Sequence, residues 1–334
     1  MRFVKKIFIY ALIGVVLTVL PLYYVNNILL AEASADEIKE VALTNIKSVL
    51  KKNGITIPNG AELISLTNDE NVVAYLLNGQ VILKDIKSDS EVERIVEDSD
   101  IIYFKPLYDR NIILYFIYSD NQIKIMTYNM DTKDKMEHKS FRIDNFVRVK
   151  DIKYSSLTNV IYVLVETGTE NGSVDKVYRI DIMKNVSLFL KDKNGIKDIE
   201  LLNKEDRLIY QDFNGAVYDK GKRVVLKVNK TRFKEFDILG IDELDNLYLY
   251  EKAEKSIFVY KDKEFVDGKS IPDFEFDRII SKNNRIYLVK GKRVYDVINF
   301  REFTIDEADE IIDILNGRVL YKRNGIYECH PCEM

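Results

Sequence analysis

The residues with the most distinct chemistry lie near the end of the chain, in the run Cys329-His330-Pro331-Cys332. The C-x-x-C spacing suits a redox dithiol or one half of a metal site. A redox pair of this kind has its first cysteine at a helix N-terminus, where the dipole lowers the thiol pKa. Only two residues follow Cys332, too few for such a helix. A tetrahedral site would also need a fourth ligand. We predict a local disulfide or two unreactive thiols and no metal site, with Cys329, His330 and Cys332 as the only metal candidates.

Other catalytic signals are weak. The second histidine, His138, lies in the polar segment 131–139 and is expected to be solvated in a loop. No G-x-S-x-G elbow is present. Five residues separate Gly215 from the Gly221-Lys222 pair, which does not match a phosphate-binding loop. We therefore predict no catalytic residues, no cofactor and no enzymatic activity.

The charge balance argues against a polyanion partner. The chain has 334 residues with 54 acidic and 50 basic side chains, a net charge of −4. Arg2, Lys5 and Lys6 are the only charges before Glu32, so the remainder has 47 basic and 54 acidic residues, or −7. Phosphate neutralisation needs clustered Lys and Arg. We expect no nucleic-acid partner.

The N-terminal region, 1–31, is predicted to anchor the chain in a membrane. Residues 7–31 carry no charge, and the 19 residues from Ile7 to Val25 would form a helix that nearly spans the ~30 Å hydrocarbon layer. Basic residues precede the segment, so the N-terminus is expected in the cytoplasm and the body outside the cell membrane. A cleaved signal peptide is the alternative, since residues 33–35 (Ala-Ser-Ala) match a cleavage site.

Residues 32–54 favour a short amphipathic helical stalk. Ser34 or Asp36 could cap the helix and Gly54 could end it. Apolar residues recur between them every three or four positions, at residues 38, 41, 42, 46, 49 and 50. This apolar stripe could pack on the main domain or on a second copy of the chain.

The sequence of the body, residues 55–334, predicts a repeated unit of β-strands. Seven tyrosines each follow a turn residue inside an apolar strand, at positions 75, 115, 162, 210, 248, 287 and 321. Their spacing averages 41 residues, since 321 − 75 = 246 over six steps. Repeats of ~40–50 residues with four strands each are typical of β-propellers. We predict an all-β propeller with seven blades, or six, with a stacked sandwich or solenoid as the alternative folds.

The last repeat supplies only about three strands, so a strand from the start of the body should complete it and remove an open edge. Residues 55–57 and 63–66 are the two candidates. Residues 306–310 carry the only helical pattern within the body.

One blade resembles a known superfamily. The run Ile241–Tyr248, IDELDNLY, followed by the strand Ile257–Tyr260, is similar to NHL-type propeller repeats, whose pattern is D-x-x-G-N-L-Y and then a strand. Asp245 stands where that pattern has Gly, and the other blades match in general form only. Trp-Asp repeats are excluded because the chain has no Trp. The resemblance implies a propeller architecture and, weakly, a binding role.

Together these features predict a membrane-anchored extracytoplasmic propeller that serves as a binding or scaffold module. The expected ligand is a protein, a peptide or a glycan of the envelope. A sensor or accessory subunit acting through a membrane partner is an alternative, and so is a lyase or hydrolase centred on the channel. The low histidine count argues against the enzyme. Lys, Ile and Asn usage suggests a bacterial source.

Overall fold

The computed structural model describes residues 54–69, 71–170, 172–228, 231–262, 264–271 and 274–331. The anchor predicted at 1–31 and nearly all of the stalk predicted at 32–54 therefore lie outside the described residues. Among the described residues, none belongs to a helix long and apolar enough to span a bilayer.

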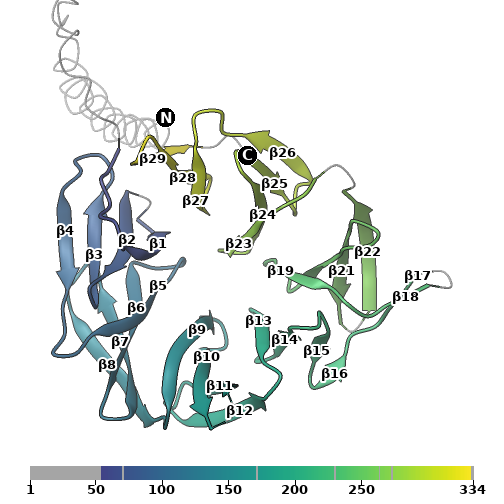
Figure 1. Cartoon of the computed structure of the whole chain (residues 1–334), viewed down its shortest axis with the longest axis horizontal. Coiled ribbons are helices and arrows are strands. Elements are labelled where there is room, and N and C mark those ends of the chain that lie inside the picture. The colour runs from purple at the N-terminus through teal and green to yellow at the C-terminus, as the bar shows by residue number, and fades with distance from the viewer. Residues whose placement is uncertain are drawn as a thin grey trace, which may run out of the picture. The chain divides into compact units, whose positions relative to one another are not determined.

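Seven antiparallel sheets are arranged around a central axis, which confirms the seven-blade propeller (Figure 1). Each sheet follows the chain from its innermost strand outward. Blade 1 consists of β1 (Glu62–Leu66), β2 (Val72–Leu77), β3 (Gln80–Asp85) and β4 (Glu91–Ile95). Blade 2 consists of β5 (Ile101–Pro106), β6 (Ile112–Ser119), β7 (Gln122–Asn129) and β8 (Lys135–Arg142). Blade 3 consists of β9 (Phe146–Ser155), β10 (Val160–Thr169), β11 (Gly172–Ile180) and β12 (Val186–Asp192).

Blade 4 is β13 (Ile196–Leu201), β14 (Leu208–Asp212), β15 (Val217–Asp219) and β16 (Lys222–Arg223). A separate hairpin, β17 (Leu226–Val228) and β18 (Thr231–Phe233), follows it. Blade 5 consists of β19 (Asp237–Ile241), β20 (Leu247–Glu251), β21 (Ser256–Lys261) and β22 (Glu264–Ser270). Blade 6 consists of β23 (Arg278–Lys282), β24 (Arg285–Lys290), β25 (Arg293–Asp296) and β26 (Arg301–Thr304). Blade 7 consists of β27 (Glu310–Leu315), β28 (Arg318–Arg323) and β29 (Ile326–Pro331).

The tyrosine repeat corresponds to one structural position. All seven tyrosines lie on the second strand of their blades, β2, β6, β10, β14, β20, β24 and β28. Six of them are buried, and Tyr210 is half-buried. In two of the blades the hydroxyl group donates to a carboxylate at 2.7 Å, Tyr115 to Glu97 and Tyr162 to Asp206. The second strand has a blade on either side, so an aromatic ring there fills the space between blades.

The start of the body closes the ring. Blade 7 has three strands of its own, and Ile55 pairs with Tyr327 of its outer strand β29. The Ile55 N–H donates to the Tyr327 carbonyl at 2.7 Å, and the Tyr327 N–H donates back at 2.9 Å. Of the two predicted closing segments, 55–57 is therefore correct, and 63–66 belongs to β1, the innermost strand of blade 1.

Bulges shape the innermost strands. The pairing register shifts by a bulge in every innermost strand except β23. Asp151, Asp198 and Asp313 directly follow three of these bulges, and each accepts a hydrogen bond from the next backbone N–H at 2.7, 2.8 and 2.9 Å. Bulges re-aim side chains, and these three carboxylates line the channel of the ring.

The structure contains two turns that bear on the sequence predictions, one at 306–309 and one in the NHL-like blade. The prediction of a helix at 306–310 is wrong, because residues 306–309 form the turn between β26 and β27 and Glu310 begins β27. Asp242 holds the NHL-like turn by accepting hydrogen bonds from the Leu244 and Asn246 N–H groups at 2.8 and 2.9 Å. Asp245 has φ of 63°, the left-handed conformation that explains why the repeat pattern prefers Gly there. Its carboxylate accepts the Asn203 N–H of blade 4 at 2.6 Å, which no glycine could do.

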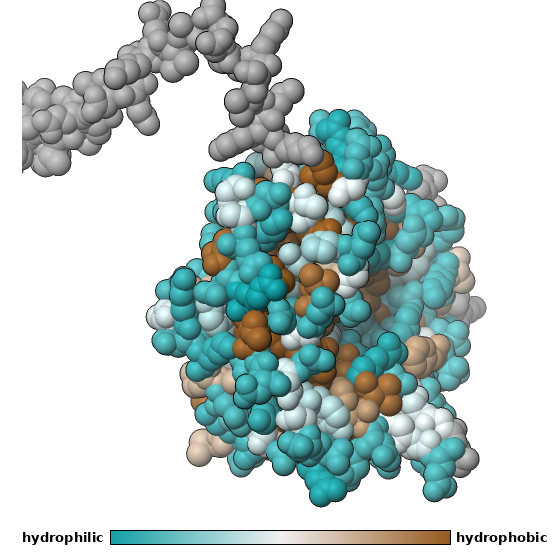
Figure 2. All heavy atoms as spheres, turned by 60° about the vertical axis from the view of Figure 1, so that its left-hand side comes forward, coloured by the Kyte–Doolittle hydropathy of each residue, from teal (hydrophilic) through white to brown (hydrophobic). Residues whose placement is uncertain are grey.

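The outer surface is mainly polar. Figure 2 shows one side of the molecule as largely hydrophilic, with hydrophobic side chains in separate patches. Large apolar side chains that remain exposed include Val92 on β4 and Met136 on β8. The apolar residues otherwise pack in clusters within and between the blades.

Candidate functional site: the channel and its mouth

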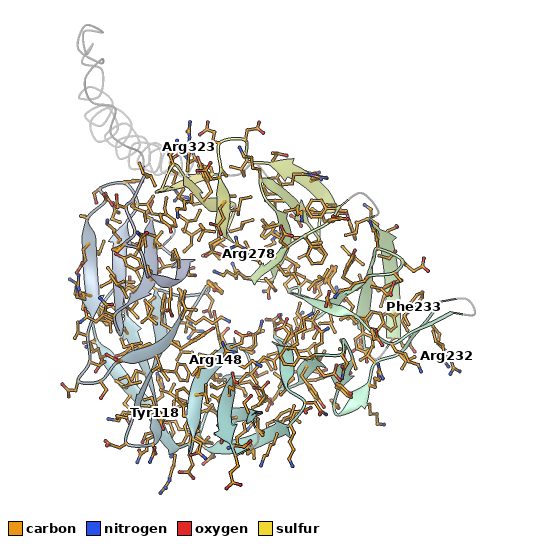
Figure 3. All side chains as sticks on the ribbon, in the orientation of Figure 1. Tyr118, Arg148, Arg232, Phe233, Arg278 and Arg323 are labelled. Atoms are coloured by element: carbon orange, nitrogen blue, oxygen red, sulfur yellow. The ribbon has the colours of Figure 1, made fainter. Side chains whose placement is uncertain are left out.

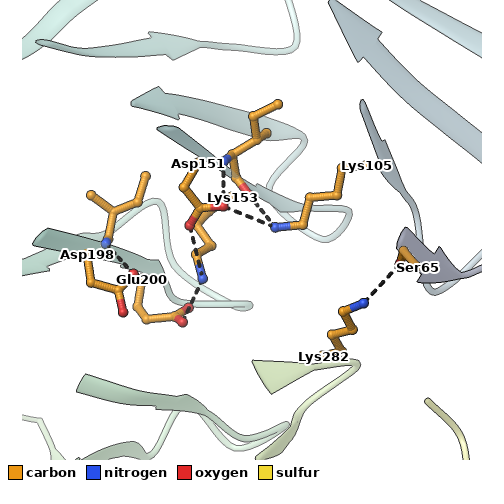
Figure 4. Close-up of polar contacts among 9 residues, drawn as sticks. Ser65, Lys105, Asp151, Lys153, Asp198, Glu200 and Lys282 are labelled. Carbon is orange, nitrogen blue, oxygen red and sulfur yellow. Dashed lines mark hydrogen bonds and ion pairs between the residues drawn. The ribbon is translucent and has the colours of Figure 1, made fainter. Parts of the chain in front are cut away.

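Charged side chains of both signs converge in the central channel. A cavity of about 330 Å³ is lined by residues of β5, β9, β13, β23 and β27. In Figure 3 Arg278 extends into the opening of the ring, and Figure 4 shows most of the other charged groups. The cavity has four cationic and four anionic side chains: Lys105, Lys153, Arg278, Lys282, Asp151, Asp198, Glu200 and Asp313.

One ion-pair network joins blades 2, 3 and 4. The Lys153 ammonium lies 2.7 Å from Glu200 and 3.4 Å from Asp151. Lys105 donates to the Ile152 carbonyl at 2.5 Å and lies 3.5 Å from Asp151. These lysines are more than four-fifths buried, so the pairs are screened less than surface pairs.

A second network joins blades 6, 7 and 1. The Lys282 ammonium lies 2.6 Å from the Asp313 carboxylate and 2.9 Å from the Ser65 hydroxyl. The same carboxylate accepts the Leu66 N–H at 2.8 Å. The ammonium also lies 5.2 Å from the centre of the Tyr108 ring. These contacts hold the first and last blades together at the axis.

The channel environment sets the protonation of its groups. Burial alone would raise the pKa of Asp151, but Lys153 and Lys105 more than offset it, and the pKa falls. Burial lowers the pKa of Lys105. Burial, with Glu200 and Asp151 adding to it against Lys153, raises the pKa of Asp198 to about 7. Asp198 therefore changes charge near neutral pH.

The channel opens into a polar mouth where the innermost strands end. This cavity, of about 280 Å³, includes Lys105, Lys153 and Lys282 at its base. Hydroxyl and amide groups from the ends of these strands and the turns that follow complete it, namely Tyr154, Ser155, Ser156, Asn203, Ser281, Asn283 and Asn284. The Tyr154 hydroxyl accepts the Tyr108 N–H at 2.7 Å, which fixes the ring at the rim. Such groups suit a ligand that is rich in hydrogen-bonding groups.

An apolar groove lies beside the mouth, between blades 2 and 3. It has a volume of about 410 Å³, and its walls come from β6, β7, β8, β10 and the ends of β9 and β11. Met136 and Ile182 line it, with exposures of 54% and 66%. Tyr154, Ser155 and Ser156 line both the mouth and the groove, so the two cavities are adjacent. Leu157, next in the same turn, is also exposed.

The predicted metal candidates lie far out on blade 7. Cys329 and His330 are on β29, the outermost of its three full strands. The His330 ring lies 5.6 Å from the Tyr321 ring, and its Nε2 atom is 3.5 Å from Glu328. Cys332 lies outside the described residues. Within the described ranges, no three His, Cys, Asp or Glu residues are grouped to hold a metal. The role of the C-x-x-C pair stays a prediction.

The placement of His138 in a solvated loop is wrong. It lies on the outer strand β8, half-buried, with Nε2 2.8 Å from the Thr127 hydroxyl. Burial, with a smaller effect from Lys184, lowers its pKa. The ring lines the apolar groove and not the channel.

The channel groups are not among the residues predicted from the sequence. Their signal is present in Asp151-Ile152-Lys153 and Asp198-Ile199-Glu200, where charged residues flank an isoleucine on predicted strands. Charges two residues apart lie on one face of a strand. The pattern becomes informative only once these strands are known to be the innermost ones.

Comparisons with known proteins support the fold only. No family model matches the chain, and no curated protein matches it. A streptogramin B lyase structure has a TM-score of 0.53 at 13% identity, covering 83% of this chain and 95% of that one. A catalytically inactive histidine-to-alanine variant of virginiamycin B lyase from Staphylococcus aureus, with quinupristin, has a TM-score of 0.51 at 12% identity, covering 82% and 96%.

Proposed function

We propose that this protein is a membrane-tethered, extracytoplasmic binding module that captures an extended segment of a partner protein. The segment would lie across the channel mouth and the apolar groove. The observation that carries the proposal is that these two cavities lie side by side and share Tyr154, Ser155 and Ser156 in their walls. A polar mouth beside an apolar groove suits a peptide that inserts apolar side chains into one and hydrogen-bonds in the other.

The exposed apolar residues around the groove support recognition of a protein. Met136 and Ile182 line the groove and Leu157 lines the mouth, and their exposure costs solubility unless a partner covers them. They lie on turns and strand ends of a rigid ring, the usual position of binding residues.

The channel chemistry supports binding over catalysis. Its lysines contact carboxylates within the ring, so their charge holds blades together. Both histidines lie on outer strands, β8 and β29. The similar lyase is inactive as a histidine-to-alanine variant, whereas no histidine lines the channel among the residues described here.

The tether rests on the uncharged run at 7–31 with basic residues only before it. The expected result is that the protein stays in the membrane fraction after a high-salt wash and is digested by protease added to intact protoplasts. Resistance to protease in intact protoplasts would contradict the extracytoplasmic location. A soluble mature form starting near Asp36 would contradict the tether alone.

Peptide binding can be tested by selecting a displayed peptide library on the purified full chain in micelles. The expected result is a consensus with apolar anchors whose binding is lost in Ile182→Asp. Val266→Asp is the matched control, because both side chains are 66% exposed and Val266 lies on β22, in blade 5. Equal binding by both variants, or no consensus, would argue against the groove.

A further inference from the structure

The basic residues of the propeller are strongly segregated. Residues 220–234 contain seven Lys or Arg and no Asp or Glu. Outside this segment the chain has 43 basic residues (50 − 7) and 54 acidic ones, a balance of −11. The low overall charge therefore hides a basic segment.

Part of this segment, β17 and β18, forms a hairpin that projects from the ring, whereas Lys222 and Arg223 form β16 at the edge of blade 4. β17 and β18 extend outward after blade 4 in Figure 1, and Figure 3 labels Arg232 and Phe233 on the hairpin. Its base is fixed by packing, since Leu226 is buried and the Phe233 ring lies 5.9 Å from the Phe258 ring of blade 5. We name residues 220–234 the basic hairpin.

The described cations of the basic hairpin have no carboxylate partner. Six of them are exposed: Lys220, Lys222, Arg223, Lys227, Arg232 and Lys234. None of the six forms an ion pair with a carboxylate of the described residues, and Arg223 instead donates to the Lys234 carbonyl at 3.1 Å. The nearby carboxylate of Asp219 is bound by Arg207. This contrasts with the channel, where lysines contact carboxylates.

Two of these cations also oppose each other. Lys227 and Arg232 are directly paired across β17 and β18. Like charges in this position destabilise a two-stranded hairpin, and a two-stranded hairpin has little stability to lose. An anionic surface that neutralises both side chains would remove this cost.

We propose that the basic hairpin docks on the anionic phospholipid surface of the membrane to which the chain is tethered. Lys227 and Arg232 lie on the projecting strands, and Lys220, Lys222 and Arg223 lie at the neighbouring edge of blade 4. This open arrangement of exposed cations suits an array of mobile headgroups. The proposal rests on the tether of the proposed function, because a tethered domain meets the bilayer at high effective concentration. Electrostatic attraction of this kind decays within a Debye length, so contact needs a projecting element.

The absence of Trp from the chain allows a direct test. Val225→Trp places a single fluorophore in the basic hairpin, and Val92→Trp on β4 of blade 1 is the matched control, with exposures of 38% and 49%. The full chain is reconstituted in vesicles of brominated phosphatidylcholine, with or without phosphatidylglycerol. We expect quenching of the Val225→Trp variant only when phosphatidylglycerol is present, reversed by high salt, and none of the control.

A charge reversal completes the test. In the Val225→Trp background, Lys227→Glu with Arg232→Glu should weaken phosphatidylglycerol-dependent quenching at least about tenfold, because each basic residue near the surface contributes to attraction. Lys191→Glu with Lys193→Glu, two exposed residues of blade 3, should leave it unchanged. Equal quenching without phosphatidylglycerol, or no effect of the hairpin reversal, would overturn the proposal. Hairpin-dependent binding to a DNA duplex without binding to the vesicles would also overturn it.

Membrane anchoring by the N-terminal segment is tested in a separate measurement. If the chain fails to remain with neutral vesicles after the salt wash, the tether is wrong, and co-sedimentation of the full chain with phosphatidylglycerol vesicles then measures the hairpin alone. Co-sedimentation that is lost in the Lys227→Glu, Arg232→Glu variant would still support docking, and its persistence there would refute it.

Discussion

Replacing Asp198 by Asn should stabilise the propeller at alkaline pH and have little effect in acid. The carboxyl group faces the channel beside Glu200 and Asp151 and accepts the Ile199 N–H at 2.8 Å. Burial raises its pKa from 3.8 to about 7. The Asn side chain keeps the shape and one acceptor oxygen while removing the charge.

The direction of this pH dependence of the unfolding free energy follows from proton linkage. The folded state holds the Asp198 proton more tightly than the unfolded chain, so this proton's contribution to stability is complete below about pH 4 and is lost as the pH rises through the folded pKa. Each pKa unit corresponds to about 1.4 kcal/mol, and the shift of about three units sets an upper bound of about 4 kcal/mol. The Asn variant avoids this loss.

Urea unfolding of the full chain in micelles, followed by circular dichroism at about pH 4 and about pH 8, measures the difference. The expected gain in unfolding free energy is 2 to 4 kcal/mol, approximately, at the higher pH and near zero at the lower one. Asp134→Asn, in the exposed turn between β7 and β8, is the control. A gain of the same size at both pH values, or no gain at about pH 8, would refute the electrostatic reasoning.

Three further outcomes follow from the fold. Tyr115→Ala should lower the unfolding free energy by about 3–5 kcal/mol, because the ring is fully buried between blades, and a change below about 1 kcal/mol in urea unfolding would contradict that packing. Ile55→Pro removes the N–H that bonds to Tyr327, so limited proteolysis should open blade 7 first; unchanged cleavage would count against ring closure. Replacing Cys329 and Cys332 by Ser should leave stability and peptide binding nearly intact, and loss of bound zinc in that double variant would show the opposite.

The repeat could be predicted because one residue type marks one structural position. The second strand of each blade needs a large side chain that fills the space between blades and a polar end that reaches the rim, and tyrosine meets both needs. Tyr115 and Tyr162 show this directly through their carboxylate partners. The pairing of Ile55 with the last blade could likewise be predicted, since a last repeat of three strands leaves an open edge that another segment must cover.

The channel network could not be predicted because its partners are distant in sequence. Lys153 and Glu200 are 47 residues apart, and Ser65 and Lys282 are 217 apart. Only the closed ring brings them to one axis. A lysine or aspartate at such a position is indistinguishable, in sequence, from one on a solvated strand.

The basic hairpin was missed for a different reason. The net charge of the whole body averages the local excess of basic residues near Lys227 against acidic residues elsewhere, so the excess shows only in the charge of a short segment. His138 was misplaced because polar neighbours such as Glu137 and Lys139 indicate a loop, whereas an outer strand exposes polar residues on its open face as well.

Photo-crosslinking in living cells tests the central claim, binding at the channel mouth and apolar groove, most directly. A benzophenone amino acid at Leu157 lies on the proposed surface, and the same residue at Val92 lies on the outer strand of blade 1. We expect one discrete protein adduct from position 157, which is lost when Ile182→Asp is added and is absent from position 92. No adduct at position 157, or the same adduct from both positions, would contradict the account.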